Sequence, residues 1–229
     1  MIGIIGAMTL EIEGLRALMS EKQEKTVSGI NFVSGILEGQ KVVTAVSGIG
    51  KVFAAICAEA MILEFNPDVI INTGVAGTLT DKLGIGDIAV AEKVVQHDMD
   101  TSPLGDPRGL ISGINVIYIN ADKKCSDGLS RAAGELGLKT LYGTVASGDQ
   151  FIASADKKKD IVESFNAIAC EMEGAAIGHV CYVNGKPFAV LRAISDSADG
   201  NAETDYPTFA KTAAENYIKV VSGYLNSLS

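Results

Sequence analysis

Short apolar runs alternate with amphipathic stretches along most of the chain. The apolar runs are four to eight residues long, too short for helices, and are typical of buried strands. They lie at residues 2–7, 69–72, 88–95, 116–119, 141–146, 167–170 and 187–194. Apolar residues three or four apart predict helices at residues 11–19, 51–65, 122–136 and 206–228. Residues 30–37 and 41–46 flank Gly39 and predict a β-hairpin, and a further short helix is expected to begin near Glu171.

This alternation predicts the fold class. Strands that alternate with helices are typical of a mostly parallel sheet with helices packed on it. We predict an α/β fold in which residues 1–229 form a single domain, with a central mixed, mostly parallel β-sheet flanked by helices on both faces. Residues 97–113 are polar and rich in proline and glycine, and we interpret them as an excursion or lid rather than a linker between domains.

Polar residues follow the ends of several predicted strands. In sheets of this kind, ligands bind beyond the carboxyl ends of the strands. If these ends lie at one rim, several carboxylates, one arginine and several glycines converge there. The residues concerned are Glu11, Asn72, Thr73, Gly74, Ser147, Gly148, Asp149, Glu171, Glu173, Arg192, Ser195 and Asp196.

The composition narrows the class of ligand. The chain has 19 basic and 28 acidic residues, and its formal net charge of -9 would repel a phosphate backbone. No apolar run reaches the roughly 18 residues of a membrane span, and residues 1–5 lack the basic start of a signal peptide. We therefore expect a cytoplasmic protein that acts on a small molecule and binds neither nucleic acid nor membrane.

Several familiar cofactor and metal motifs are incomplete. The four cysteines form no CxxC pair and the two histidines have no metal-ligand spacing. Residues 3–6 lack the second glycine of a dinucleotide-binding turn. Residues 47–51 resemble the end of a P-loop, but Ala45 replaces its first glycine and Val52 its magnesium-binding hydroxyl. We interpret them as a tight turn whose backbone donors open the next helix, and we expect no metal and no cofactor.

A set of short motifs carries a family resemblance. The motifs are Ile4-Ile5-Gly6-Ala7-Met8 with Glu11, Ile71-Asn72-Thr73-Gly74, Ser147-Gly148-Asp149-Gln150-Phe151-Ile152, Glu171-Met172-Glu173 and Arg192-Ala193-Ile194-Ser195-Asp196. In this order and with these separations, the sequence resembles the 5′-methylthioadenosine/S-adenosylhomocysteine nucleosidases of the nucleoside phosphorylase superfamily. The likeness runs from the first strand to the last helix. It implies hydrolysis of the N-ribosidic bond of both nucleosides, which releases adenine and a 5-thio-substituted ribose.

The resemblance implies a role for individual residues. Activation of the hydrolytic water falls on Glu11, and protonation of adenine N7 falls on Asp196. Glu173 matches the residue that binds the ribose hydroxyls, and Met172 packs against the sugar. Phe151 matches the ring that stacks on adenine. The water is then a co-substrate, and the nucleoside is the small-molecule partner.

Other residues complete the implied site. The resemblance implies a homodimer in which the partner subunit closes the pocket for the 5′-substituent, and Leu104 in the excursion is the nearest match for that residue. Glu171 receives no catalytic role and is expected to shape the turn. The remaining substrate-binding residues are Met8, Ile152 through its backbone, Arg192 near the water, Ser195, Tyr206 and Phe209.

The implied chemistry explains these residue types. Breaking an N-ribosidic bond builds positive charge on the sugar and negative charge on the purine, so an acid is needed on one side and a carboxylate on the other. Placing them on opposite sides is the logic of direct glycoside hydrolysis. Asp196 must hold a proton near neutral pH, which requires burial or a neighbouring negative charge.

Three alternatives remain open from the sequence. The first is a nucleosidase for another purine nucleoside, such as futalosine or 5′-deoxyadenosine, and the second is a phosphorylase. Few arginines lie near the proposed rim, which disfavours phosphate binding. The third is a sensor that binds a nucleoside without turnover; its support is Val75, which stands where the family usually has a small hydroxyl residue that helps to hold the water.

Overall fold

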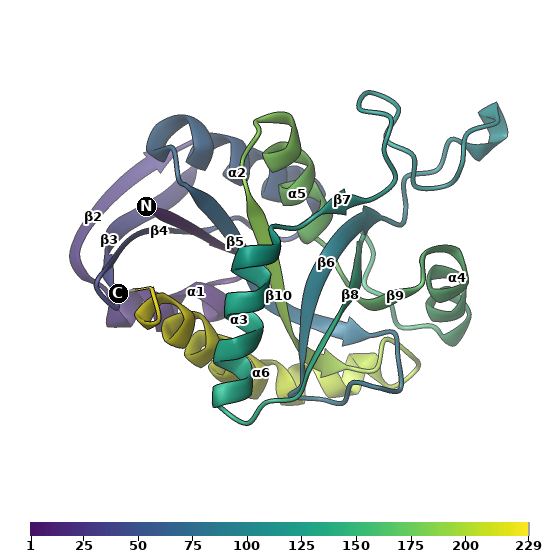
Figure 1. Ribbon diagram of the computed structural model, residues 1–229. Helices are drawn as coiled ribbons and strands as arrows, with labels where there is room; N and C mark the ends of the chain where they lie inside the picture. Colours follow the sequence, from purple (N-terminus) through teal and green to yellow (C-terminus); the bar gives the residue numbers. More distant parts are fainter. Residues whose placement is uncertain (229) are drawn as a thin grey trace.

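The computed structural model describes residues 1–228, apart from the side chain of Thr204 (Figure 1). The strands are β1 (Ile2–Gly6), β2 (Ser20–Val27), β3 (Ile30–Leu37), β4 (Gln40–Val46), β5 (Val69–Thr78), β6 (Ile88–Gln96), β7 (Ile119–Asn120), β8 (Thr140–Ser147), β9 (Ala167–Glu171) and β10 (Phe188–Asp196). The helices are α1 (Thr9–Leu18), α2 (Lys51–Phe65), α3 (Lys123–Glu135), α4 (Ala155–Phe165), α5 (Gly174–Val183) and α6 (Ala202–Asn226), with a short 3₁₀ helix, η1, at Ser102–Leu104.

All ten strands form one mixed sheet. The strand order is β10-β6-β8-β9-β5-β1-β4-β3-β2, with β7 paired to β6. Strand β5 also pairs with β10, so β10, β6, β8, β9 and β5 form a closed circuit from which the other strands extend. Parallel pairs join β1 to β4 and β5, β5 to β10, and β8 to β6 and β9. The predicted α/β fold is confirmed, and closure of the circuit is a feature that the hydrophobic pattern did not indicate.

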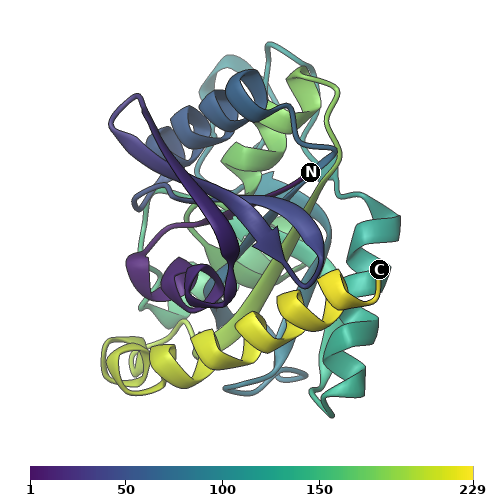
Figure 2. The same ribbon diagram turned by 90° about the vertical axis from the view of Figure 1, so that its left-hand side faces the viewer.

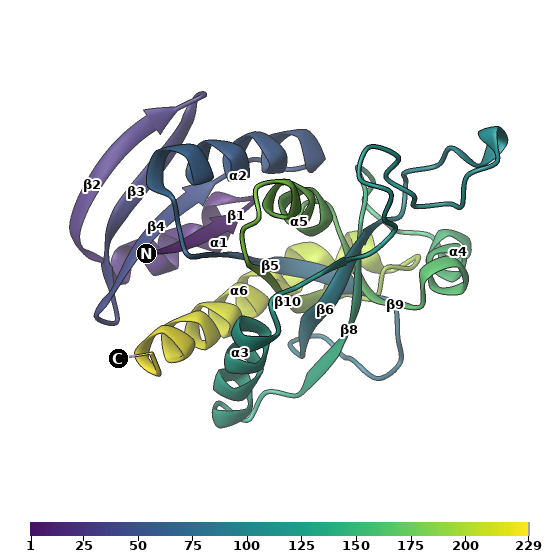
Figure 3. The same ribbon diagram turned by 45° about the horizontal axis from the view of Figure 1, so that its top comes forward.

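Helices cover both faces of this sheet. Figure 3 shows α2 and α5 on one side and α3 and α6 on the other, and Figure 2 shows α6 running along the opposite edge from α2. Ile12, Leu129 and Val220 belong to the core beneath α1, α3 and α6. Met61 and Ile177 belong to the core beneath α2 and α5. Burial of apolar area on both faces is the main favourable term that holds the sheet in this arrangement.

Most predicted elements are present, with boundaries shifted by a few residues. The helix at Lys51–Phe65 and the strand at Ile30–Leu37 match their predicted bounds. The strand predicted at residues 116–119 is largely wrong, because only Ile119 and Asn120 pair with β6. Helix α6 begins before residue 206 and continues through Pro207, which removes one backbone donor from it.

Two elements were not predicted, because their sequences give little apolar signal. Strand β2 at Ser20–Val27 is exposed along almost its whole length and pairs on one side, with β3. Helix α4 at Ala155–Phe165 buries two residues, Ile161 and Phe165. Within residues 1–228, no helix combines the length and the apolar composition needed to cross a membrane.

Candidate active site

A cavity of about 320 Å³ lies at the carboxyl ends of β1, β5, β9 and β10. The predicted site residues that line it are Met8, Glu11, Phe151, Met172, Glu173, Arg192, Ser195, Asp196 and Tyr206. Ile152 lines an adjoining cavity of about 30 Å³, together with Asp196 and Phe151. Side chains from distant parts of the sequence therefore meet at one rim of the sheet, as expected for a ligand site in this fold class.

Glu11 is fixed at the start of α1. Its Oε2 accepts hydrogen bonds from the backbone N–H groups of Ala7 (2.6 Å) and Met8 (3.0 Å), and its Oε1 accepts one from Val75 (3.1 Å). Burial raises the pKa of its carboxyl, while the charge of Arg192 and the three backbone donors oppose that rise. Glu11 therefore caps α1 and also lines the cavity, where its role in activating water stays a prediction.

Arg192 lies at the centre of a buried group of carboxylates. Its Nη2 donates hydrogen bonds to Glu171 and to Oδ1 of Asn72, and it lies 3.5 Å from Oε2 of Glu173. The Arg192 charge also lowers the pKa of Glu11, although burial has the larger effect on that group. One guanidinium thus balances three carboxylates, and the cluster keeps a net negative charge when all three are ionised.

The two carboxylates of the Glu171-Met172-Glu173 turn have different partners. Oε2 of Glu171 accepts hydrogen bonds from the backbone N–H groups of Glu173 (3.1 Å) and Gly174 (2.8 Å), so Glu171 caps α5. Glu171 is buried, and its contacts fit the expectation that it shapes the turn. Oε1 of Glu173 accepts from the backbone N–H of Gly50 (2.9 Å). Burial raises the pKa of Glu173 to about 7, with Arg192 opposing the rise and Glu171 adding to it.

Asp196 ends β10 and also lines the cavity. Its Oδ2 accepts a hydrogen bond from the Ser195 hydroxyl (2.8 Å), and its Oδ1 accepts one from the backbone N–H of Ala198 (2.9 Å). Its side chain is 3% exposed, and burial raises its pKa; the two hydrogen bonds oppose this, and the charges of Asp205 and Asp199 add to it. The shift has the direction that a general acid requires at neutral pH.

Phe151 and Tyr206 form an aromatic wall of the cavity. Their ring centroids are 5.8 Å apart and their planes meet at 77°, an edge-to-face arrangement. The Tyr206 hydroxyl lies 3.1 Å from the sulfur of Met8, which ties the wall to the start of α1. Phe151 lines the cavity and is 48% exposed, so its ring is accessible to a ligand.

Two predicted residues lie outside the cavity lining. Leu104 ends η1 in the excursion and is 84% exposed, so it does not reach the cavity of its own chain. Phe209, on α6, is 36% exposed and also does not line the cavity. The contribution of Phe209 to substrate binding stays a prediction.

The sequence did not indicate which groups accept hydrogen bonds from the backbone N–H groups of the turn at residues 47–51. As predicted, α2 begins at this turn. The backbone N–H groups of the turn donate hydrogen bonds to carboxylates of the same chain. Gly50 N–H donates to Glu173, and Lys51 N–H donates to Oδ1 of Asp149 (2.7 Å). The glycines indicated a donor site, whereas the acceptors lie about a hundred residues away and no local pattern reveals them.

Comparisons with known proteins agree with this geometry. The profile of the Phosphorylase superfamily matches residues 1–226. A 5′-methylthioadenosine/S-adenosylhomocysteine nucleosidase of Staphylococcus aureus (strain JH9) is 39% identical over 229 residues, which cover 100% of both chains. The chain belongs to this nucleosidase family. The resemblance inferred from the motifs is therefore confirmed.

Solved structures extend the nucleosidase relationship to the whole fold. A 5′-methylthioadenosine/S-adenosylhomocysteine nucleosidase from Neisseria meningitidis, in complex with methylthio-immucillin-A, has a TM-score of 0.95 at 36% identity and covers 99% of this chain and 98% of its own. A futalosine hydrolase of Helicobacter pylori has a TM-score of 0.94 at 35% identity, with coverages of 99% and 97%. Since both are this similar, the backbone alone does not separate their substrates.

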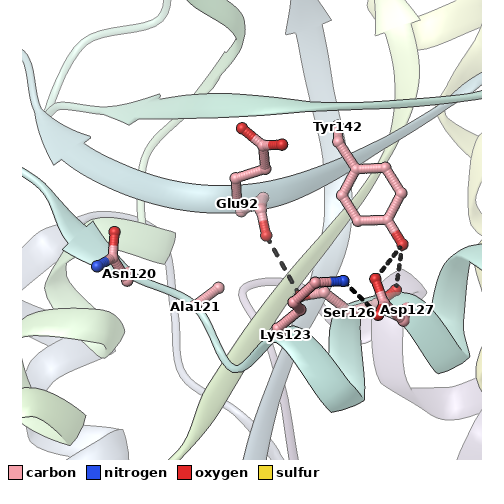
Figure 4. A pocket seen from close by; sticks show the side chains of 8 residues that line it. Glu92, Asn120, Ala121, Lys123, Ser126, Asp127 and Tyr142 are labelled. Atoms are coloured by element: carbon pink, nitrogen blue, oxygen red, sulfur yellow. Dashed lines mark hydrogen bonds and ion pairs between the residues drawn. The ribbon is translucent and has the colours of Figure 1, made fainter.

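A larger cavity of about 470 Å³ in this nucleosidase shares no lining residue with the carboxylate site (Figure 4). Three of its polar side chains are already engaged: Lys123 Nζ donates to Oδ2 of Asp127 (2.6 Å), and the Tyr142 hydroxyl donates to the backbone oxygen of Ser126 (3.1 Å). We therefore assign the chemistry to the smaller cavity, where buried carboxylates with raised pKa values face the ligand space.

We expect Gly74→Ala to reduce nucleosidase activity at least about tenfold, since small displacements of catalytic groups carry large costs. A Cβ at this position would collide with Nη1 of Arg192 and Oε1 of Glu11. Steady-state kinetics checks this, with Gly134→Ala as the matched control because a Cβ there meets nothing within 4 Å. Wild-type activity of Gly74→Ala, with the fold intact, would contradict the proposed closeness of Glu11 and Arg192.

Proposed function

We propose that this chain hydrolyses the N-ribosidic bond of 5′-methylthioadenosine and S-adenosylhomocysteine, releasing adenine and the 5-thio-substituted ribose. The observation that carries the proposal is the arrangement of Glu11, Glu173 and Asp196 around one cavity, each buried and each with a raised pKa. Relatives named for this activity, at 36–39% identity over nearly the whole chain, support the substrate class.

The proposed mechanism divides the charges of the reaction among these carboxylates. Asp196 donates a proton to adenine N7, so the leaving purine departs without negative charge. Glu11 accepts a proton from the attacking water, and its three backbone donors keep it in place during the step. Glu173 binds the ribose hydroxyls and favours the positive charge that develops on the sugar. Phe151 stacks on the purine, with Met172 against the sugar.

The same contacts support hydrolysis over phosphorolysis. Among the described residues that line the cavity, Arg192 is the one cation, and its Nη2 is already paired with Glu171. The backbone donors at the start of α2, which could otherwise bind an anion, hold Glu173 and Asp149. An incoming phosphate would therefore meet carboxylates rather than free donors.

A substrate panel tests the proposal. We expect adenine release from methylthioadenosine and S-adenosylhomocysteine, free sugar as the second product, and no dependence on phosphate. Futalosine hydrolysis is the second candidate, since the Helicobacter pylori hydrolase has nearly the same backbone. Faster turnover of futalosine or of 5′-deoxyadenosine would replace the proposed substrate, sugar 1-phosphate would indicate a phosphorylase, and tight binding without turnover would indicate the sensor.

We also propose a homodimer in which the partner subunit's Leu104 covers the 5′-substituent. Exposed apolar side chains on α2 and α5 support an interface there: Val52 is 70%, Phe53 56%, Leu63 72% and Val183 63% exposed. The proposal also includes a cytoplasmic location, which fits four buried free thiols.

Leu104→Asp is expected to raise KM for methylthioadenosine about tenfold, because a charge would replace an apolar cover over the thioether. The dimer mass should be unchanged, since Leu104 lies in the excursion and not on α2. Light scattering coupled to gel filtration, together with kinetics, checks both points. Phe53→Asp is the companion variant and should produce monomers with the same rise in KM. A monomeric wild-type protein with full activity would overturn the proposal.

A further inference from the structure

A closed ring of hydrogen bonds lies beside the active site, at the start of the excursion. Oδ1 of Asp98 accepts from Nζ of Lys51 (2.6 Å), and Oδ2 of Asp98 accepts from the backbone N–H of Asp149 (2.9 Å). Oδ1 of Asp149 in turn accepts from the backbone N–H of Lys51 (2.7 Å). The ring joins three segments that are far apart in sequence: the end of β6, the start of α2 and the loop after β8.

The ring is partly shielded from water and carries charge. The side chains of Lys51 and Asp98 are 18% and 16% exposed, and Nζ of Lys51 also donates to Gln96 (3.1 Å). Burial alone would raise the pKa of Asp98, but the hydrogen bonds from Lys51 and Asp149 outweigh it and hold the pKa below its ordinary value. Asp98 is therefore ionised, and its hydrogen bonds are of the stronger, charge-assisted kind.

Two of the joined segments lead directly into the nucleoside site. Gly50, the neighbour of Lys51, donates its N–H to Oε1 of Glu173, the proposed ribose ligand. Phe151, two residues beyond Asp149, forms the wall proposed to stack on the purine. Asp98 itself does not line the cavity. It connects the ribose end and the purine end of the site without touching either.

We propose that Asp98 is a positioning residue that sets the separation between the ribose-binding Glu173 and the purine-stacking Phe151. The inference rests on the proposed nucleosidase function. It also gives the P-loop-like turn at residues 47–51 a role: the turn binds carboxylates of its own chain and so transmits the position of Asp98 to Glu173. Glu11 and Asp196 have no bond to this ring, so the chemical groups stay in place when it is broken.

The expected consequence is a separation of KM from kcat. In Asp98→Asn the amide keeps the shape of the side chain, but Lys51 loses its ionised partner and the two segments are free to shift. The shift weakens contacts that are made equally in the ground state and the transition state, while Glu173 keeps the charge that favours the positive sugar. KM for methylthioadenosine should therefore rise about tenfold while kcat stays within about threefold. Lys51→Met breaks the ring from the other side and should give the same separation. The double variant should be no worse than either single variant, because both remove one interaction.

Steady-state kinetics and thermal unfolding of the whole protein, with methylthioadenosine as the probe, test the proposal. Asp127→Asn is the matched control, since it removes an exposed ion pair with Lys123 (2.6 Å) and should change neither parameter. Unchanged KM with a lowered Tm would show a merely structural role, and a fall in kcat at unchanged KM would also overturn the proposal. If Asp98→Asn does not fold, Lys51→Met decides. If the wild-type protein releases no adenine, the proposed function itself is wrong. This outcome differs from the outcomes that contradict only the role of Asp98.

Discussion

Asp196→Asn is expected to lower kcat for adenine release by about 10²–10⁴-fold, the range that a general acid contributes. The asparagine amide can still donate a hydrogen bond to N7, but it has no proton to transfer. Because the purine keeps its hydrogen bond, KM should change little. Adenine release is measured in stopped and continuous assays at saturating methylthioadenosine. Asp68→Asn is the control, since it alters an exposed carboxylate that pairs with the N-terminus (2.6 Å).

The pH profile gives a second test of Asp196. Activity requires the protonated carboxyl, so it should be lost as pH rises through the raised pKa of Asp196. Asp196→Asn should remove this alkaline limb. Ser195→Ala should move the limb to higher pH, because the Ser195 hydroxyl donates to the carboxylate and thereby lowers its pKa. An undiminished kcat for Asp196→Asn would assign the acid to another group.

The sequence predicted the helices that bury one face and the strands that are buried on one or both faces. Strand β10 is buried at every position, and its apolar run is recognisable without any other information. Strand β2 could not be found in this way, because Glu24 and Lys25 lie in a run of exposed polar residues that pairs on one side only. Strand β2 pairs with β3 through backbone hydrogen bonds, and the pattern of hydrophobic residues does not reveal such bonds.

The sequence predicted the polar residues that line the cavity, but not the hydrogen bonds that join them. Strand-end polar residues converge on one cavity, because β1, β5 and β10 are parallel and the end of β9 pairs antiparallel with the last residues of β5. The bond from Gly50 to Glu173 spans 123 positions, and that from Lys51 to Asp149 spans 98. Such pairs form because the closed circuit of strands brings distant loops together. The hydrophobic periodicity of one segment does not indicate where another segment lies in space. Glu171 is the clearest case, because its buried partner Arg192 lies 21 positions away in the sequence.

Glu11→Gln is expected to lower kcat by about 10²–10⁴-fold, because the water loses its base. The amide nitrogen would also face backbone donors that now point at a carboxylate, so α1 should lose part of its cap and the protein about 0.5–2 kcal/mol of stability.

Since the base must be ionised, wild-type activity should fall as pH drops through the raised pKa of Glu11, and this fall on the acid side of the pH profile should be absent from Glu11→Gln. The matched control on the same helix is Glu13→Gln, which removes an exposed pair with Arg16 (3.2 Å) and should leave kcat within twofold. A Glu11→Gln variant that retains both its rate and its acid limb would show that the water is activated elsewhere.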